Sequence, residues 1–135
     1  MSNILVFDSS VIVDHLRTGR HQRRIDSLVG LIRTSSVVLA ELWRGAATVQ
    51  EREFLRALEK NHPIFTPTEN NWLESGQLLT RMRAEKGLDS GKLRDLHFDV
   101  LIALTARSRG ARLITSNRAD FELIRHYRKF ELEIW

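Results

Sequence analysis

Short apolar runs alternate with longer segments of helical periodicity along the chain, and this alternation limits the fold more than any other feature. Strands are predicted at residues 3–7, 33–36, 112–115 and 130–134. The pair Ile64-Phe65 lies between two prolines and predicts an edge strand, because proline cannot donate to a central ladder. Strands separated by helices favour a mainly parallel α/β sheet with right-handed crossovers.

Apolar residues at helical spacing occupy the segments between these strands. Helices are predicted over residues 10–17, 25–32, 39–45, 49–60, 69–86, 95–109 and 120–124. The second of these is assigned from Ile25, Leu28, Val29 and Ile32, which follow the i, i+3, i+4, i+7 pattern. The segment from Val100 to Ala106 is apolar nearly all round, so its helix is expected to be central and buried. No repeat or linker divides the chain, which predicts one domain over residues 1–135.

Composition agrees with a soluble protein that binds a polyanion. No apolar run reaches the roughly 18 residues needed to span a bilayer, and the amino terminus does not resemble a secretory signal. The absence of cysteine excludes disulfides and thiolate metal sites and is compatible with the cytoplasm, where we expect the protein to be. The net charge of +4 comes mostly from arginine, whose planar fork grips phosphate, although charge alone is a weak argument for nucleic acid.

Four junctions between predicted strands and helices carry an acidic or amide side chain. Asp8 follows the first strand, Glu41 lies in the first turns of a helix, and Asp99 opens the buried helix. Asn117 and Asp120 follow a later strand. Because ligands of open α/β sheets bind beyond the carboxyl ends of the strands, we expect these side chains to converge on one cleft.

Such a group of acids favours a hard metal ion. An ionised carboxylate in apolar sequence is costly unless it is paired or bound to a cation. Two carboxylates about 4 Å apart repel by roughly 4 kcal/mol at an effective dielectric near 20, and a cation between them removes that repulsion. Mg²⁺ and Mn²⁺ prefer oxygen ligands and can activate a water against a phosphodiester. The pattern therefore predicts a metal-dependent nuclease.

Each of these residues also has a purely structural interpretation. Asp8 is placed to cap the first helix, although the serines that follow it can do the same. Glu41 suits a solvated position beside an apolar helical face. Asp99 suits a first-turn acid that favours the helix dipole, although an aspartate one turn earlier already serves there. Asn117 suits a turn and Asp120 a helix cap.

Other residue types give little support for a different chemistry. The five histidines share no ligand spacing and are assigned to surface or boundary positions. No Gly-rich phosphate loop exists, which argues against a nucleotide cofactor. Arg44 and Arg118 lie close to Glu41 and Asn117 in sequence, and either contact a phosphate or are simply solvated. Two tryptophans at residues 43 and 72 are assigned to the core.

The four junctions resemble the motifs of PIN-domain proteins. The residues that carry the resemblance are Val6-Phe7-Asp8-Ser9-Ser10-Val11-Ile12, Ser36-Val37-Val38-Leu39-Ala40-Glu41-Leu42, Asp99-Val100-Leu101-Ile102-Ala103-Leu104-Thr105-Ala106 and Thr115-Ser116-Asn117-Arg118-Ala119-Asp120-Phe121. The similarity is closest to the VapC-type ribonuclease toxins of type II toxin–antitoxin pairs. The four motifs occur in the same order over nearly the whole chain, which makes the match specific.

The resemblance implies a three-layer α/β/α sandwich, Mg²⁺- or Mn²⁺-dependent cleavage of RNA, a homodimer and an antitoxin that blocks the acidic cleft. Carried over by motif, Asp8 and Asp99 are the principal metal ligands and Glu41 completes the cluster. Many relatives have an aspartate where this chain has Asn117. The resemblance therefore implies that Asp120 supplies the remaining charge as a metal ligand, and that Asn117 hydrogen-bonds or orients.

Two other functions compete with the endoribonuclease that these observations favour. A catalytically inactive PIN-like module that binds RNA or protein would explain the basic composition and the imperfect fourth acid. A phosphatase could use Asp8 as its nucleophile, but haloacid-dehalogenase-like phosphatases need a second aspartate at the position of Ser10. We therefore predict the Mg²⁺-dependent endoribonuclease toxin of a toxin–antitoxin pair, with metal-activated water as the nucleophile.

Overall fold

Strands and helices alternate along the protein, as its sequence predicts. The structure is a computed structural model that describes residues 2–135. Its elements follow the order β1 (Ile4–Phe7), α1 (Ser9–Thr18), α2 (Gln22–Ser27), β2 (Leu31–Ser35), α3 (Ser36–Gly45), α4 (Val49–Asn61), β3 (Ile64–Phe65), α5 (Glu69–Lys86), α6 (Ser90–Ser108), β4 (Arg112–Thr115), α7 (Arg118–Tyr127) and β5 (Glu131–Ile134).

All five strands of the described chain form one parallel sheet with the order β3-β2-β1-β4-β5. The chain moves from β1 outward to β3, then crosses back to β4 on the other side of β1. This reversal places a topological switch point at the carboxyl ends of β1 and β4, where open α/β sheets bind their ligands. The register pairs Phe7 with Ile114 at that end. The residues that follow β1 and β4 are therefore neighbours in space.

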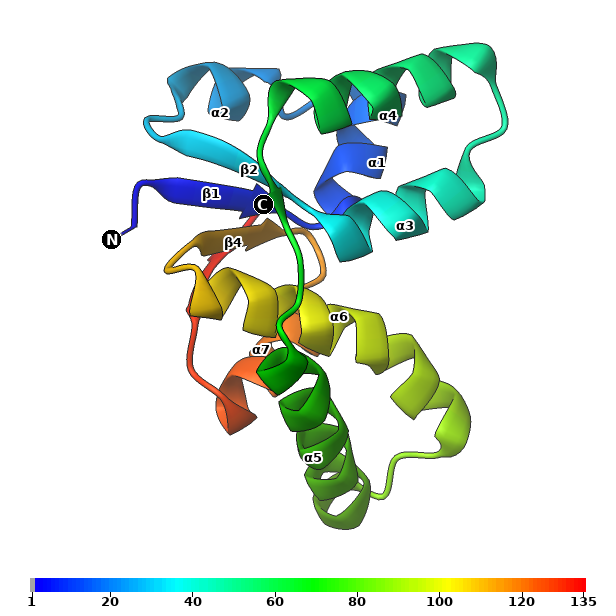
Figure 1. The fold of residues 1–135 in the computed structure, drawn as a ribbon, viewed down its shortest axis with the longest axis vertical. Helices are drawn as coiled ribbons and strands as arrows, with labels where there is room; N and C mark the ends of the chain where they lie inside the picture. Colours follow the sequence, from blue (N-terminus) through cyan, green and yellow to red (C-terminus); the bar gives the residue numbers. More distant parts are fainter. Residues whose placement is uncertain (1) are drawn as a thin grey trace.

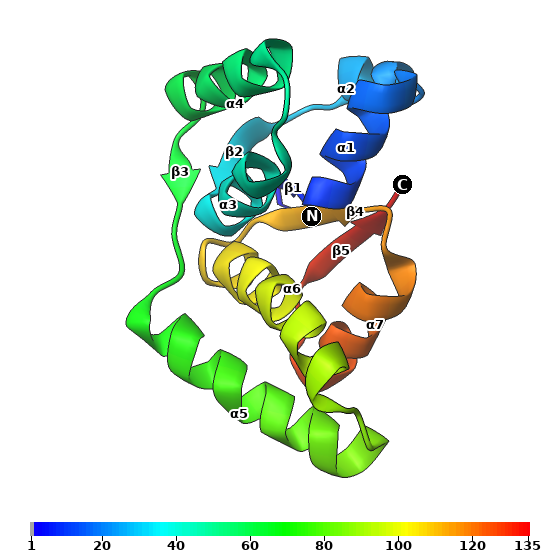
Figure 2. The same ribbon diagram turned by 90° about the vertical axis from the view of Figure 1, so that its right-hand side faces the viewer.

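Helices cover both faces of the sheet, which gives the predicted three-layer α/β/α arrangement. Helices α1, α2 and α4 lie on one side of the sheet, and α6 and α7 lie on the other, with α5 outside α6 (Figures 1 and 2). Helix α3 follows the end of β2 and contacts α1, α4 and α6. Successive side chains of β1 point to opposite faces of the sheet, as the pleat of a strand requires. Leu5 packs with Val11 of α1, whereas Val6 packs into the larger core around α6.

Helix α6 forms the centre of the larger core. Every residue from Val100 to Ala106 is buried, so the prediction of a central apolar helix is confirmed. The helix contacts β2 and β4 on one side and α5 and α7 on others. Each fully buried aliphatic side chain stabilises the fold by about 1.5–3 kcal/mol relative to an exposed one. This buried helix is a rigid support for the acids that it carries.

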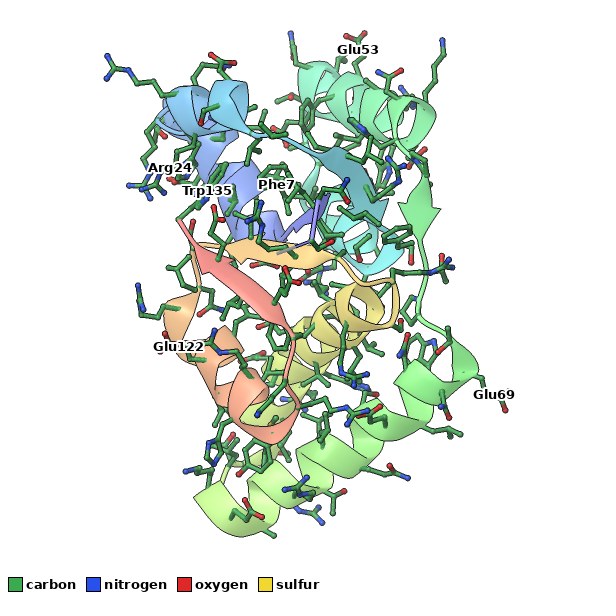
Figure 3. All side chains as sticks on the ribbon, turned by 90° about the vertical axis from the view of Figure 1, so that its left-hand side faces the viewer. Phe7, Arg24, Glu53, Glu69, Glu122 and Trp135 are labelled. Atoms are coloured by element: carbon green, nitrogen blue, oxygen red, sulfur yellow. The ribbon has the colours of Figure 1, made fainter. Side chains whose placement is uncertain are left out.

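The smaller core closes around the last residue of the chain. The Trp135 ring lies edge-on to Phe7 at a centroid distance of 5.4 Å, and the Arg24 guanidinium lies 5.6 Å from its centre. Figure 3 shows the three side chains together beneath α2. The backbone N–H of Trp135 donates to the carbonyl oxygen of Thr115 at 2.8 Å. The chain end thus ties β5 to β4 next to the switch point.

The helix predicted over residues 25–32 is wrong in its second half. Helix α2 ends at Ser27, Val29 is 85% exposed, and Leu31 begins β2. The N–H of Leu31 donates to the carbonyl oxygen of Asn3 at 2.7 Å, which starts the pairing with β1. Gly30 has φ +150°, and a Cβ there would collide with the same carbonyl group. Pairing with a buried strand therefore outweighs the helical spacing of this segment.

Helix α6 starts one and a half turns earlier than predicted. Its first residue is Ser90, and the Asp89 side chain caps it by accepting from the N–H of Lys92 at 2.8 Å. Asp99 consequently lies in the middle of α6 rather than at its start. Trp72 is 51% exposed, so its assignment to the core is wrong. Within residues 2–135, no helix is both long enough and apolar enough to cross a membrane.

Candidate functional site

An open acidic pocket of about 510 Å³ lies at the carboxyl end of the central strands. Figure 1 shows α1 and α3 on one side of this end of the sheet and α6 on the other. All five predicted site residues line the pocket: Asp8, Glu41, Asp99, Asn117 and Asp120. The remaining lining residues are Ser9, Ser10, Val13, Asp14, Arg17 and Asp95. The structure therefore brings together acids that are up to 112 positions apart in the chain.

Asp8 lies at the floor of the pocket, where β1 ends. Its N–H continues the ladder to β4 by donating to the carbonyl oxygen of Ile114 at 2.9 Å. Its side chain is directed by two hydroxyls, since Ser10 Oγ donates to Oδ2 at 2.7 Å and Thr115 Oγ1 donates to the same oxygen at 2.8 Å. Asp8 occupies the N-cap position of α1 but makes no side-chain capping bond to the described residues. Its capping interpretation is therefore not supported.

Both hydroxyls are themselves held by the backbone. The N–H of Ser116 donates to Ser10 Oγ at 3.1 Å, and the N–H of Asn117 donates to Thr115 Oγ1 at 3.0 Å. Because each hydroxyl oxygen accepts from a backbone amide, its single proton is left for the carboxylate of Asp8. This arrangement fixes which oxygen of Asp8 is occupied by protein donors.

The other carboxylate oxygen of Asp8 is the clearest functional signal in the pocket. Asp8 is only 2% exposed, and its Oδ1 is buried without a hydrogen-bond partner within residues 2–135. Leaving a buried acceptor unsatisfied costs about 1–3 kcal/mol, and more for a charged group. An oxygen in this condition, on a side chain that lines a pocket with further carboxylates, fits the first ligand of a cation.

Glu41 approaches Asp8 from α3. Ser9 Oγ donates to Glu41 Oε1 at 3.3 Å, which joins the start of α1 to α3. Burial and the negative charge of Asp8 raise the pKa of Glu41, although Ser9 and Arg44 oppose the shift. Glu41 is half-buried, so it is not the freely solvated residue of the structural interpretation.

Asp99 faces the same charges from the opposite side of the sheet. Burial and the negative charges of Asp8, Glu41 and Asp120 raise the pKa of Asp99 to about 8, and Lys92 opposes this shift. A carboxyl group in such surroundings is protonated near neutral pH unless a cation compensates for its charge. The shift therefore shows that the acids of the pocket act on one another.

Asp120 differs from the other acids because both of its carboxylate oxygens already have partners. Lys92 Nζ lies 2.8 Å from Oδ1, and Asn117 Nδ2 donates to Oδ2 at 3.1 Å. Asn117 also caps α7 by accepting from the N–H of Asp120 at 3.4 Å. Burial raises the pKa of Asp120, but the hydrogen bonds from Lys92 and Asn117 lower it. Together these bonds outweigh burial, so the pKa lies below its usual value. The helix cap is therefore Asn117 and not Asp120, which lies in the first turn of α7.

Four charged residues of this region were not predicted as site residues. Asp95 and Lys92 precede Asp99 by four and seven positions on α6, and Asp14 and Arg17 belong to the turns of α1 that follow Asp8. Helical spacing from Asp99 could have found Asp95 and Lys92, because residues four or seven apart share one face of a helix. Asp14 and Arg17 lie six and nine positions after Asp8, so this spacing does not point to them. Asp14 is already paired, with its Oδ2 2.7 Å from His21 Nε2.

The expectation for one histidine is wrong, and the two arginines that are close to the acids in sequence lie outside the pocket. His21 is 3% exposed and buried against Asp14, so it is not a surface or boundary residue. Arg44 lies over the ring of Phe98, 5.9 Å from its centre, and Arg118 pairs with Glu122 at 2.9 Å. Neither arginine lines the pocket, whereas Arg17 does.

The donor set of the pocket fits Mg²⁺ or Mn²⁺, which take carboxylate and hydroxyl oxygens and keep several waters. Asp8, Glu41 and Asp99 would hold such an ion, with the unsatisfied Oδ1 of Asp8 as the observation that supports the fit. Within the described residues, no three Asp, Glu, His or Cys side chains are already arranged around one point as metal ligands.

Solved structures with the same fold include three toxin–antitoxin complexes. The chain is 26% identical to a chain of VapBC2 from Rickettsia felis bound to a DNA fragment from their promoter, with a TM-score of 0.74 and 98% of both chains covered. It is 23% identical to a chain of VapBC-1 from nontypeable Haemophilus influenzae, with a TM-score of 0.73 over the same shares. A toxin–antitoxin complex from Klebsiella pneumoniae matches at 21% identity, with a TM-score of 0.61 and 87% and 89% of the two chains covered.

Sequence comparison finds a matching family model but no matching curated protein. No curated protein matches the chain closely enough to be counted as a relative. The family model described as PIN domain matches residues 5–127, which include every acid of the pocket. This protein belongs to the PIN domain family.

Proposed function

We propose that this protein is a Mg²⁺- or Mn²⁺-dependent endoribonuclease and the toxin of a toxin–antitoxin pair. The observation that carries the proposal is the buried, unsatisfied oxygen of Asp8 in a pocket that it shares with Glu41 and Asp99. Membership of the PIN domain family supports the nuclease activity. Likeness to the VapBC complexes supports the role as a toxin.

The chain's own residues would hold and orient the reacting groups. Asp8, through Oδ1, and Asp99 are the principal ligands, and Glu41 completes the cluster. A divalent ion bound there lowers the pKa of a water and stabilises the charge that develops on a phosphodiester. Ser10 and Thr115 keep Asp8 in one rotamer, and Ser9 restrains Glu41. This preorganisation limits the rearrangement that binding requires.

RNA would reach this pocket despite its negative lining. The formal net charge of the whole chain is +4, and basic surface attracts the phosphate backbone over a Debye length of about 8–10 Å. Arg17 is exposed on the pocket wall, where a guanidinium can bind the phosphate next to the one that is cut. A divalent ion held by Asp8, Glu41 and Asp99 would offset part of the negative charge of the pocket and so reduce its repulsion of the substrate.

The proposal includes two protein partners. A cognate antitoxin would cover the pocket; the similar structure from Klebsiella pneumoniae is a toxin–antitoxin complex. A second copy of the chain would form a homodimer. Light scattering of the purified protein, alone and co-expressed with the product of an adjacent short reading frame, measures both.

An inactive RNA- or protein-binding module is the second candidate. Two observations favour it: the Lys92 ion pair already neutralises one acid, and the described residues hold no ready-made ligand set. Calorimetric titration separates the candidates, because the module would not bind Mg²⁺ or Mn²⁺ at millimolar concentration.

Cleavage of single-stranded RNA by purified protein tests the proposed activity. We expect wild-type protein and Asp26→Asn, which changes an exposed aspartate of α2, to cut with Mg²⁺ or Mn²⁺ and not with EDTA. Asp99→Asn should cut at least about a hundredfold more slowly, because it removes a ligand of the ion. Equal cleavage by wild type and Asp99→Asn would show that the activity does not come from this pocket.

A further inference from the structure

We infer that Lys92 takes the place of a second divalent cation, so that the acidic pocket binds a single ion, at Asp8, Glu41 and Asp99. This inference rests on the proposed metal-dependent function and specifies how that site works. It assigns to Asp120 the role of anchoring an ammonium group rather than that of a metal ligand. It also gives the pocket two unequal ends, one for a metal and one with a built-in positive charge.

The contacts of Asp120 are the first part of the argument. Lys92 Nζ lies 2.8 Å from Oδ1, and Asn117 Nδ2 donates to Oδ2 at 3.1 Å, so protein donors engage both oxygens. A carboxylate in this condition binds a metal only by giving up a charged hydrogen bond. Asp8, by contrast, has both protein donors on Oδ2, and its Oδ1 has no partner within residues 2–135.

The position of Lys92 on α6 is the second part. Its backbone N–H is fixed by Asp89 Oδ1 at 2.8 Å, and its half-buried stem runs toward α7. Asp95 and Asp99 follow at i+3 and i+7, which places all three on one face of the helix. The ammonium group is therefore held beside the acids that a second ion would need, and their charges act on it.

Charge explains why the ammonium and a second ion exclude each other. A second ion would need Asp120 together with Asp95 or Asp99, and Lys92 already lies against Asp120 and near the other two. A divalent cation at contact distance from an ammonium is strongly repelled, so it binds only if Lys92 moves away. Lysine suits this role because it places a compact point charge at the end of a flexible stem.

Binding of Mn²⁺ to the purified full chain tests the inference. We expect wild type to bind one Mn²⁺ in calorimetric and electron paramagnetic resonance titrations, and Lys92→Met to bind two. The affinity of the second ion should rise at least about tenfold when the competing positive charge is removed. Lys60→Met, which removes an exposed lysine of α4 on the other side of the sheet, should still bind one ion.

Asp120→Asn provides an independent test that does not depend on the folding of the Lys92 variant. We expect it to bind one Mn²⁺ with an affinity within about threefold of wild type, whereas Asp99→Asn weakens binding at least about tenfold. Two ions in wild type, one ion in folded Lys92→Met, or loss of the wild-type ion in Asp120→Asn would each overturn the inference alone. No Mn²⁺ binding by wild type at millimolar concentration would overturn the proposed function itself.

Discussion

Asp8 and Asp120 are the same residue type at two ends of one pocket, yet their surroundings are opposite. Asp8 is buried, its Oδ2 accepts from two neutral hydroxyls, and its Oδ1 has no partner among the described residues. Asp120 is partly exposed, and a lysine and an amide engage both of its oxygens. The difference leads us to expect a divalent ion at Asp8, where the fold leaves one oxygen unsatisfied, and not at Asp120.

The two ends also differ in how the fold builds them. Asp8 follows β1 at the switch point of the sheet, and the hydrogen bond of its N–H to Ile114 fixes the backbone. Asp120 lies in the first turn of α7, where Asn117 and a long side chain from α6 determine its contacts. A strand end thus supplies the rigid half of the pocket, and two helix starts supply the half that carries compensating charge.

Replacing Asp8 by Asn gives the largest expected effect on this comparison. The substitution keeps the size of the side chain but removes the charge that the bound ion requires. We expect RNA cleavage to fall by about a thousandfold, measured under single-turnover conditions with Mg²⁺, with a folded protein by circular dichroism. A variant that cuts within tenfold of wild type would remove the distinction between the two ends of the pocket.

The pH dependence of stability sharpens the comparison next. The pKa of Asp99 is about 8 in the folded protein and roughly 3.9 in an unfolded chain. The stability linked to its raised pKa is therefore fully present below about pH 4 and is lost as the pH rises through about 8. Asparagine cannot ionise, so metal-free Asp99→Asn should exceed wild type by about 5 kcal/mol in free energy of unfolding at pH 8.

Urea unfolding in EDTA at pH 5 and pH 8 measures this difference. Asp26→Asn serves as the control, because Asp26 is exposed on α2 and far from the acids that act on Asp99. If the stability of Asp99→Asn and wild type changed with pH in parallel, the acids of the pocket would not be coupled.

Removing one hydroxyl donor from Asp8 should have a smaller effect. Thr115→Val keeps the shape of the side chain and frees Asp8 Oδ2 of one of its two donors. We expect cleavage to fall about tenfold and the free energy of unfolding by about 1–2 kcal/mol, because groups that orient a metal ligand act indirectly. Thr105→Val is the matched control, since that buried hydroxyl donates only to the backbone oxygen of Leu101. Equal losses of activity in both variants would assign Thr115 a merely structural role.

Asp120→Asn should have the smallest effect on cleavage. The variant leaves the free oxygen of Asp8 intact and removes only the anchor of Lys92. We expect a loss of about fivefold, comparable to that of one charged hydrogen bond of about 1 kcal/mol. Initial rates with saturating Mg²⁺ measure it. A loss as large as that of Asp8→Asn would make the two ends of the pocket equivalent.

The order of elements and the central helix could be predicted because periodicity reports burial directly. A short apolar run located β1, alternation of apolar residues located β5, and the apolar segment from Val100 to Ala106 located the core of α6. The spacing of Ile25 to Ile32 misled, because pairing with β1 draws Leu31 and Ile32 into a strand that was predicted to begin only at Arg33. Position at strand ends likewise located the acids of the pocket.

The partners of the acids could not be predicted from the sequence. Ser10 lies two residues from Asp8, but Thr115 is 107 residues away and meets it only because β1 and β4 are neighbours. Lys92 lies outside the helix that was predicted, whose start was placed at residue 95. Its contact with Asp120 depends on the packing of α6 against α7. Such contacts follow from the topology of the sheet and not from spacing.

The location of Mn²⁺ in crystals soaked with the ion tests the central claim most directly. Anomalous scattering at the manganese edge reports each bound ion without assumptions about activity. The predicted result is one peak about 2.1 Å from Asp8 Oδ1, with Asp99 and Glu41 drawn toward it and Lys92 still on Asp120. A pocket without a peak, or a peak held by Asp120 while Asp8 Oδ1 stays free, would contradict it.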